Sequence, residues 1–393
     1  MVTDDTSSGS LRDLLLYFLR LGAFGFGGPI ALAGRMRRDL VETRGWIGER
    51  DYAEGLALAQ LAPGPLAAQL AMYLGWVRYG IPGATLVGAT FVFPSFLMVL
   101  ALSALYVRFG GMPWISGAFY GIGAAVIALI GLSAWKLVRA TLGKDRLLFA
   151  LCAVSAVVTA WTGKETVPLI VLCGLIALFV KAPPYGKGRR APSETLGLAP
   201  LPAWLLTGAA GTAASLGTLG QIGLYFAAAG AFVFGSGLAI VPFLHGGVVE
   251  QHHWLTERQF VDAVAVAMVT PGPVVITVAF IGYLVAGPLG AVAAALGVFL
   301  PCYLFVIVSA RHFRRAAQNP SVKAFVDGVT AGATGAIAGA VFVLGRRSIV
   351  DLPTVLIALA ALAVLLKAKK VPEPLVILSA GMIGALLQSH AAS

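Results

Sequence analysis

A Pro-Gly-Pro triplet interrupts a long apolar run at two places in this chain. The first is Pro63-Gly64-Pro65 and the second is Pro271-Gly272-Pro273. Proline removes a backbone amide donor and clashes with the preceding helical turn, so no helix passes through such a triplet unbroken. In hydrocarbon, the backbone groups freed by a break need protein or a water-lined cavity to satisfy them. The two triplets therefore predict a pair of broken helices around an internal site.

The composition places the chain in lipid. Of its 393 residues, 59% are hydrophobic and only 11% are charged, whereas a soluble protein carries roughly 25% charged residues. Many apolar runs reach the roughly 20 residues that a membrane-spanning helix needs. The net charge of +11 comes from short basic loops between apolar runs, which is typical of orientation signals. We expect an all-α integral membrane protein whose partner is the lipid bilayer, with no nucleic-acid binding.

The apolar segments predict the helices and divide the chain into two halves. The stretch 182–202 is polar and rich in proline, glycine and basic residues, and it is the predicted cytoplasmic linker between repeats 1–181 and 203–393. The segments are 11–34, 52–79, 81–108, 114–140, 146–163, 166–181, 203–217, 219–244, 260–285, 288–310, 324–345, 351–367 and 372–388.

The two halves match each other at an almost constant offset, which indicates a tandem duplication. Residues of the same type recur 208 positions apart through the first part of each half, then 207 and finally 206 positions apart. The pairs are Phe26 and Phe234, Trp46 and Trp254, Glu49 and Glu257, Pro63 and Pro271, Pro94 and Pro301, and Asp145 and Asp351.

Loop charges predict how the halves are oriented. Basic loops occur at 35–44, 136–146, 181–190, 311–323 and 367–370. If every apolar segment crossed the membrane, the loop 136–146 would lie on the wrong side for the positive-inside rule. If each Pro-Gly-Pro segment is a re-entrant hairpin, all five loops face the cytoplasm and the second half is inverted. Inverted repeats with broken helices are a transporter architecture. Whether 203–217 spans the membrane, and which side the termini face, stay open.

A glycine-rich turn precedes each Pro-Gly-Pro segment and is the first candidate substrate site. Its residues are Phe26, Gly27, Gly28 and Pro29 in the first half and Gly235, Ser236 and Gly237 in the second. Successive unpaired amides in such a turn form an anion-binding nest. The alternative is close helix packing by small residues, which is common in membranes.

The broken helices supply the second candidate. Half-helices starting near Leu66 and Val274 would point free N–H groups and positive dipole ends at an anion. Polar side chains flank the breaks and have groups that donate to oxyanion oxygens, namely Gln60, Gln69, Thr270 and Thr277. The alternative is that these side chains satisfy the freed backbone groups.

Arg20 is the sharpest single candidate. It has apolar neighbours on both sides, and a helix starting near Leu11 would place it about 14 Å deep. A charge at that depth is costly and indicates function by default. The alternative is that its long side chain reaches back to the membrane interface. The second half has Ala228 at the matching position.

Other polar residues favour structural roles. Thr256 and Gln259 predict a capping box. Glu54 and Asp262 are expected in the first turn of a helix, where carboxylates favour the dipole. We expect helix-end stabilisation rather than proton coupling from these carboxylates and from Glu42 and Glu250. The histidines 245, 252 and 253 do not predict a metal site, because the matching first-half positions hold no histidine.

Nothing in the sequence predicts an enzyme or a cofactor. The three cysteines are far apart in apolar stretches, without metal-ligand spacing. No arrangement of a nucleophile with a base, and no phosphate-binding loop, occurs.

The motifs in their order resemble the chromate ion transporter (CHR) family, and the duplication resembles its two-domain members. The motifs are Phe26-Gly27-Gly28-Pro29, Trp46, Pro63-Gly64-Pro65 with Gln69-Leu70-Ala71, Phe93-Pro94, and their second-half counterparts. The resemblance implies a multi-pass bacterial inner-membrane protein that exports chromate, a sulfate mimic, and confers chromate resistance. It also implies that the basic residue before the glycine motif matters, and Arg20 occupies that place.

The chain departs from that pattern where relatives often carry polar residues, at Leu32 and at Leu66-Ala67-Ala68. Sulfate or another oxyanion therefore stays an alternative substrate, and a non-transporting membrane sensor or partner subunit is the alternative of another class. A homodimer is left open.

Overall fold

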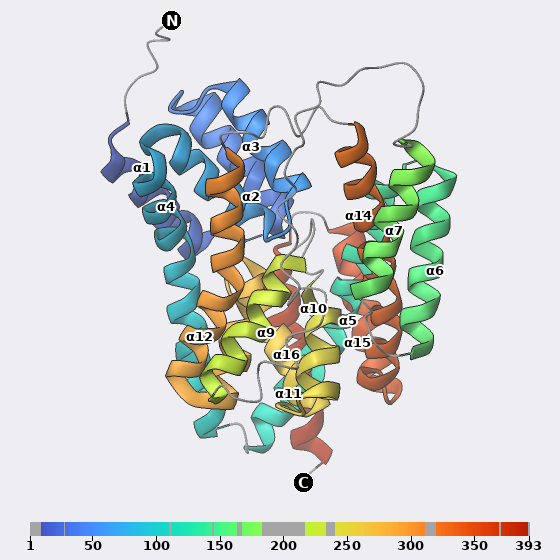
Figure 1. The fold of residues 1–393 in the computed structure, drawn as a ribbon. Helices are drawn as coiled ribbons and strands as arrows, with labels where there is room; N and C mark the ends of the chain where they lie inside the picture. The colour runs from blue at the N-terminus through green and yellow to red at the C-terminus, as the bar shows by residue number, and fades with distance from the viewer. Residues whose placement is uncertain are drawn as a thin grey trace, which may run out of the picture.

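The computed structural model describes residues 9–26, 28–109, 112–143, 145–162, 167–182, 217–232, 240–310, 320–368 and 371–391. Every regular element among these residues is helical (Figure 1). The helices are α1 (Leu11–Phe24), α2 (Gly28–Met36), η1 (Arg37–Thr43), α3 (Glu49–Leu61), α4 (Leu66–Phe109), α5 (Pro113–Leu142), α6 (Arg146–Thr162), α7 (Val167–Lys181), α9 (Thr218–Phe232), α10 (Ile240–His245), η4 (Gly246–Gln251), α11 (Glu257–Val269), η5 (Val274–Ile276), α12 (Thr277–Ala310), α14 (Pro320–Ser348), α15 (Leu352–Lys367) and α16 (Glu373–Ala391).

The first Pro-Gly-Pro triplet is the tip of a helical hairpin. Gly55 of α3 faces Tyr73 and Leu70 of α4, so the two helices run back along each other. With 13 residues, α3 is about 20 Å long, which is shorter than the roughly 30 Å of the hydrocarbon core. α3 alone therefore cannot cross a membrane.

A second reversal lies inside α4. Tyr79 and Gly80 have non-helical backbone angles, and Gly75 packs against Gly83 on the other side of that break. The continuous range 66–109 therefore consists of two helical stretches, which matches the predicted boundary between segments 52–79 and 81–108.

The second half repeats both reversals. α11 again has 13 residues, and the triplet Pro271-Gly272-Pro273 separates it from the short η5. Inside α12, Ala286 and Gly287 are non-helical, and Gly282 packs against Gly290. The hairpin of α3 lies towards the upper end of the molecule in Figure 1, and α11 lies towards the lower end.

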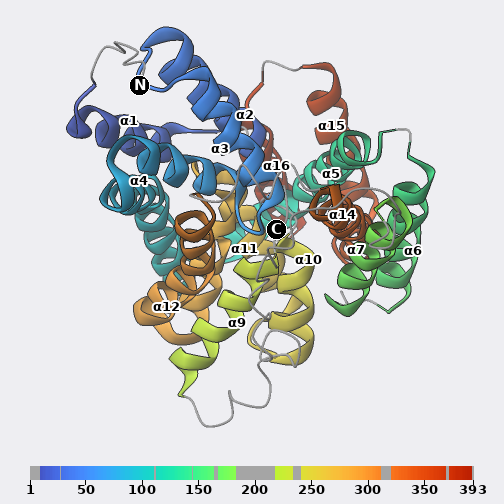
Figure 2. The same ribbon diagram turned by 45° about the horizontal axis from the view of Figure 1, so that its top comes forward.

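The two sequence halves exchange their last helices. α5 of the first half packs against α15 and α16 of the second, while α14 of the second half packs against α6 and α7 of the first. Close backbone contacts mark both exchanges, with Gly121 against the Ala380 carbonyl and Gly328 against the Cys173 carbonyl. Figure 2 shows α6, α7 and α14 side by side. Neither half buries these helices by itself.

Within the described residues, four helical ranges are long and apolar enough to cross a membrane, and the first and third of them contain the reversals described above. They are Leu66–Phe109, Trp114–Arg139, Val274–Ala310 and Pro320–Arg346. Shorter apolar helices accompany them, and large apolar side chains such as Phe93, Val157 and Leu296 are exposed on the outside. An apolar exterior of this kind fits a lipid environment.

Some expected segments differ in their bounds or lie outside the described residues. The run 11–34 forms two helices because the glycine turn interrupts it, and the run 219–244 is seen as α9 and α10, with 233–239 between them outside the description. The expected segment 203–217, apart from its last residue, and the linker 182–202, apart from its first residue, also lie outside it.

Candidate functional site

One small cavity brings together the glycine turn and both Pro-Gly-Pro breaks. Its volume is ≈ 10 Å³, about the room that one water molecule needs. Five of the predicted site residues line it, and three further apolar residues complete the lining. The predicted ones are Pro29, Pro65, Gly272, Pro273 and Val274, and the others are Leu32, Ala67 and Val275.

Helix N-termini converge on this cavity. α2 begins at Gly28, α4 begins at Leu66 and η5 begins at Val274, and each start contributes to the lining directly or through the next residue. The first N–H groups of a helix have no partner within the helix, and its N-terminus carries a partial positive charge. In this closed state the lining of the cavity is almost entirely apolar.

Each break packs against the long helix of the other half. Gly272 approaches Ser95 of α4 so closely that a Cβ there would overlap the serine Oγ. Gly64 lies against Cys302 of α12, and a Cβ there would come within 2.8 Å of the cysteine Cβ. Both glycines have positive φ, +136° and +95° for Gly64 and Gly272, which other residues rarely adopt. Ser95 and Cys302 are matching residues, 207 positions apart.

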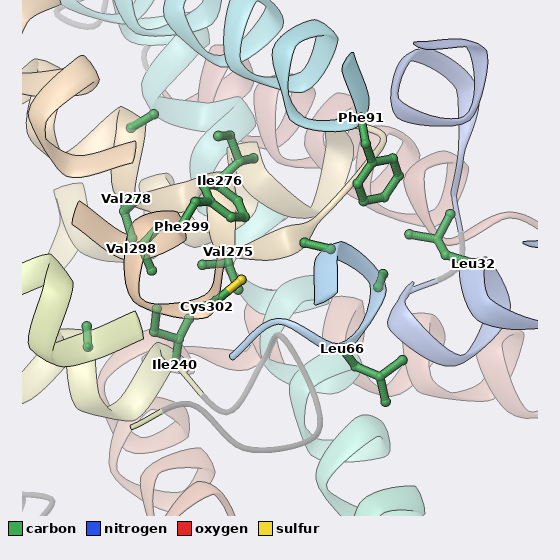
Figure 3. Packing of buried hydrophobic residues seen from close by; sticks show 14 of the residues in the cluster. Leu32, Leu66, Phe91, Ile240, Val275, Ile276, Val278, Val298, Phe299 and Cys302 are labelled. Atoms are coloured by element: carbon green, nitrogen blue, oxygen red, sulfur yellow. The ribbon is translucent and has the colours of Figure 1, made fainter. Parts of the chain in front are cut away.

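A backbone hydrogen bond joins the second break to the first-half glycine turn. The Gly272 N–H donates to the Gly25 carbonyl oxygen over 2.8 Å, and the Ser95 hydroxyl donates to the Gly22 carbonyl oxygen over 3.2 Å. Figure 3 shows Leu32 and Leu66 from the first half and Val275 and Cys302 from the second around this junction. The junction is closed in this structure.

Three of the predicted polar residues are buried and bonded to backbone. Gln69 is 0% exposed, and its Nε2 donates to the Pro63 carbonyl oxygen over 2.6 Å. Thr270 donates to Val266 and Thr277 to Val274. In this state these side chains satisfy freed backbone groups, as the alternative interpretation described, so their role in binding stays a prediction. The Gln69 Oε1 has no partner among the described residues.

The other predicted residues that the structure describes are not among those that line the cavity. Arg20 is exposed, on the same side of α1 as the exposed Leu16 and Leu19, whereas Phe18 of α1 is buried. Gln60 and Phe26 are exposed as well. Gly27 and the second-half turn residues Gly235, Ser236 and Gly237 lie outside the described residues.

The prediction for Asp262 is wrong in its position. Asp262 is in the second turn of α11, because the helix begins at Glu257. Its buried carboxylate accepts a hydrogen bond from the Tyr106 hydroxyl of α4 over 2.7 Å. Glu54 also lies in a second turn, and it pairs with Arg50 over 3.3 Å. The capping box of Thr256 and Gln259 is confirmed.

Several residues at the junction escaped prediction, although the sequence carried signals for them. Leu32 lies one helical turn after Pro29, on the same face of α2. Ser95 and Cys302 directly follow Pro94 and Pro301, which already matched across the halves. Among the described residues, no group of His, Cys, Asp and Glu is placed to hold a metal ion.

Comparison with known proteins places the chain. The family model described as "Chromate transporter" matches residues 12–179 and again residues 220–385. The chain belongs to the chromate transporter family. The match in two stretches agrees with the duplication indicated by the offsets, and the family is one of transporters, not enzymes.

Close relatives cover nearly the whole chain. A chromate transport protein of Cupriavidus metallidurans is 57% identical over 97% of this chain and 96% of its own length. A probable chromate transport protein of Synechococcus elongatus is 55% identical over the same shares. A chromate transport protein of Pseudomonas aeruginosa is 33% identical over 96% of this chain and 92% of its own. No solved structure matches the chain. With its apolar helices, this member of a transporter family is a multi-pass membrane protein.

Proposed function

We propose that this protein is a secondary active transporter that exports chromate across the bacterial inner membrane and so confers chromate resistance. The observation that carries the proposal is the convergence of three helix N-termini on one cavity between the two breaks. Helix N-termini can bind anions through their backbone N–H groups and the helix dipole, without the help of a cationic side chain. A divalent tetrahedral oxyanion is a ligand that the free N–H groups at several helix starts can bind once the breaks move apart. Relatives that cover nearly the whole chain bear the names chromate transport protein and probable chromate transport protein.

The cavity represents a closed state in this proposal. A room of ≈ 10 Å³ holds one water molecule and is too small for a metal oxyanion with four oxygens. Substrate entry therefore requires the breaks to move apart, and the bond from the Gly272 N–H to Gly25 is the one that opens. The freed N–H groups then replace part of the water shell of the anion.

The membrane arrangement in this proposal is a pair of inverted repeats. The short α3 and α11 with their triplets are re-entrant hairpins that enter from opposite sides, and their tips meet at the cavity. The two halves rock around these tips to give alternating access. Arg20 and Gln60 act outside the closed cavity, where they attract and pass on the anion.

The decisive test is flux in proteoliposomes. We expect purified protein to move labelled chromate, with sulfate and molybdate competing weakly, and an imposed pH gradient to change the rate. Stronger competition by sulfate would make sulfate or a related oxyanion the substrate. An absence of anion flux under every gradient would contradict the proposal and favour a non-transporting sensor or partner subunit.

The proposed topology has its own test. On a background without the three native cysteines, single cysteines at positions 38 and 144 are expected to react with an impermeant reagent from the cytoplasmic side. Labelling of the two positions from opposite sides would contradict the re-entrant arrangement.

A further inference from the structure

Each half carries a π-helix just before its hairpin, and the two are built alike. η1 spans Arg37–Thr43 and η4 spans Gly246–Gln251. After each one a tryptophan N–H returns to a carbonyl oxygen inside the π-helix over 2.8 Å, from Trp46 to Leu40 and from Trp254 to Val248. Donor and acceptor both differ by 208 positions between the halves. π-Helices are rare in proteins, and those that occur often lie at functional sites. A π-helix repeated in both halves therefore suggests a functional role.

A basic side chain between two carboxylates links each π-helix to the start of the following hairpin. In the first half Arg37 pairs with Glu49 over 2.9 Å and with Glu42 over 3.7 Å. In the second half His245 pairs with Glu257 over 2.8 Å and with Glu250 over 3.8 Å. All three positions correspond at the offset of 208. We call the two groups the arginine triad (Arg37, Glu42, Glu49) and the histidine triad (His245, Glu250, Glu257).

A second arginine is replaced in the same way. The Arg44 guanidinium lies over the rings of Trp46 and Tyr17, at 4.5 and 5.3 Å from their centroids. In the second half the ring of His252 takes this place, stacked at 4.4 Å on Trp254 and at 5.4 Å from Tyr225. Two fixed cations of the first half thus become two titratable groups in the second.

Burial differs between the triads. The Arg37 side chain is 49% exposed, whereas that of His245 is 4% exposed and that of Glu250 is 17% exposed. The Glu250 Oε2 is buried and has no hydrogen-bond partner among the described residues. A partly buried carboxylate with an unsatisfied oxygen depends strongly on the neighbouring cation. Protonated His245 leaves the triad with one net negative charge, and loss of that proton leaves two.

The elements packed around His245 carry further polar and charged groups. α9 contributes Tyr225, whose hydroxyl donates to the Phe243 carbonyl oxygen beside the histidine. α11 contributes Glu257 and the ring of Phe260, which lies edge-on at 5.2 Å. It also carries Arg258, which donates to the Ser116 carbonyl oxygen, and Asp262, which accepts from Tyr106. η4 contributes Glu250, with His252 following it. α14, which also packs on α10, carries three charged residues among those whose side chains are described, namely Lys323, Asp327 and Arg346.

We propose that His245, held between Glu250 and Glu257, is a proton-binding site through which the second half, and not the first, responds to pH. Bound to a proton, His245 clamps η4 onto the start of α11. When the proton leaves, the histidine charge that balances Glu250 and Glu257 is lost, and η4 loosens from the helix that leads to the second break. Arginine stays charged at every physiological pH, so the first half stays clamped. The link from this site to transport rests on the proposed function, but the site itself does not.

Hydrogen–deuterium exchange of the full-length protein in lipid nanodiscs tests the site without any substrate. Exchange rates are corrected for their intrinsic pH dependence. We expect residues 246–251 to exchange faster once the pH rises above the range in which histidine ordinarily loses its proton, near pH 6.5. About fivefold is expected for loss of one ion pair. Residues 37–43 should not change. His245→Arg should abolish the pH response of 246–251, and Arg37→His should create one in 37–43.

The same pH response in the wild type and in His245→Arg would overturn the proposal, as would no response in the wild type. If His245→Arg does not fold, the imidazole NMR signals of the wild type, assigned with His245→Gln, decide instead. A histidine that keeps one protonation state between pH 5 and 8 would overturn the site. Chromate flux across the same pH range then reports separately on the link to transport. A protein that titrates but carries no chromate would contradict the proposed function and leave the site standing.

Discussion

Gly64 and Gly272, in the two Pro-Gly-Pro breaks, are required both by their backbone angles and by the close approach of the other half. Gly272 has a φ of +95°, and any Cβ would overlap Ser95. Its N–H also holds the Gly25 carbonyl oxygen. At such a position both the left-handed conformation and the contact between halves exclude a side chain, so the triplet depends on glycine and not only on proline.

We therefore expect Gly272→Ala to damage the junction. The strained backbone alone should cost roughly 1–3 kcal/mol, and the displaced α4 should lower chromate flux at least tenfold. Gly34→Ala is the matched control, because Gly34 is helical and a Cβ there meets nothing within 4 Å. Thermal unfolding and flux measured side by side would check this, and equal behaviour of both variants would contradict it.

Arg20 allows a test of electrostatic attraction outside the cavity. We expect Arg20→Ala to lose most chromate export and tolerance, and Arg20→Lys to keep part of it, because a fixed positive charge raises the local anion concentration. Arg12→Ala, an exposed arginine on the same helix, should retain full activity. Chromate tolerance of cells with matched protein levels in the membrane measures this. Full tolerance in Arg20→Ala would exclude the role.

At the scale of elements, the hairpins and long helices hold one another across the halves. Tyr106 of α4 donates to Asp262 of α11, and its ring contacts Phe119 and Phe280 edge-on. This single side chain therefore ties the long first-half helix to the second-half hairpin. At the matching position of the first hairpin, Glu54 pairs with its helix neighbour Arg50.

Removal of the Tyr106 hydroxyl should loosen the second hairpin alone. Tyr106→Phe leaves the buried Asp262 carboxylate without that donor, which should cost about 1–3 kcal/mol. Faster hydrogen exchange is expected in 257–269 but not in 49–61. Tyr120→Phe serves as the control, because it removes a more exposed hydroxyl that bonds to Asp351. Equal exchange in the wild type and Tyr106→Phe would show that the bond carries no such weight.

At the scale of the whole molecule, exchange of the last helices makes the halves interdependent. α5 finds its partners in α15 and α16, and α14 finds its own in α6 and α7. Residue contacts such as the Ser155 hydroxyl donating to the Gly332 carbonyl oxygen over 2.7 Å reinforce the exchange. These helices of the predicted repeats 1–181 and 203–393 therefore pack on helices of the other repeat.

Neither repeat should therefore fold alone. We expect 1–181 or 203–393, expressed singly, to aggregate or be degraded, because the small-residue faces of α5 or α14 would lack their partners. Co-expression of both pieces should restore a complex that elutes as one monodisperse peak and carries chromate. A single repeat that is monodisperse and active would contradict the exchange.

Features that depend on interactions between residues close together in the chain could be predicted from the sequence alone. Apolar runs required helices in lipid, Pro-Gly-Pro required breaks, and a constant offset required two copies of one design. The sequence also contained the correspondence between Arg37 and His245, which lie 208 positions apart at matching places in the two halves. Family membership was indicated by motifs such as Phe26–Pro29 and the triplets in their order.

Which residues meet was settled by the tertiary structure. Contacts between segments about 200 residues apart depend on packing that no local sequence pattern encodes. Only the tertiary structure therefore shows that Pro29, Pro65 and Gly272 line one cavity. The exposure of Arg20 is a second example. The helix start and the depth along the helix do not determine which face of α1 is buried, because that face is set by packing against α4. Glycine contacts such as Gly64 against Cys302 depend on the partner's surface, and the partner lies in the other half.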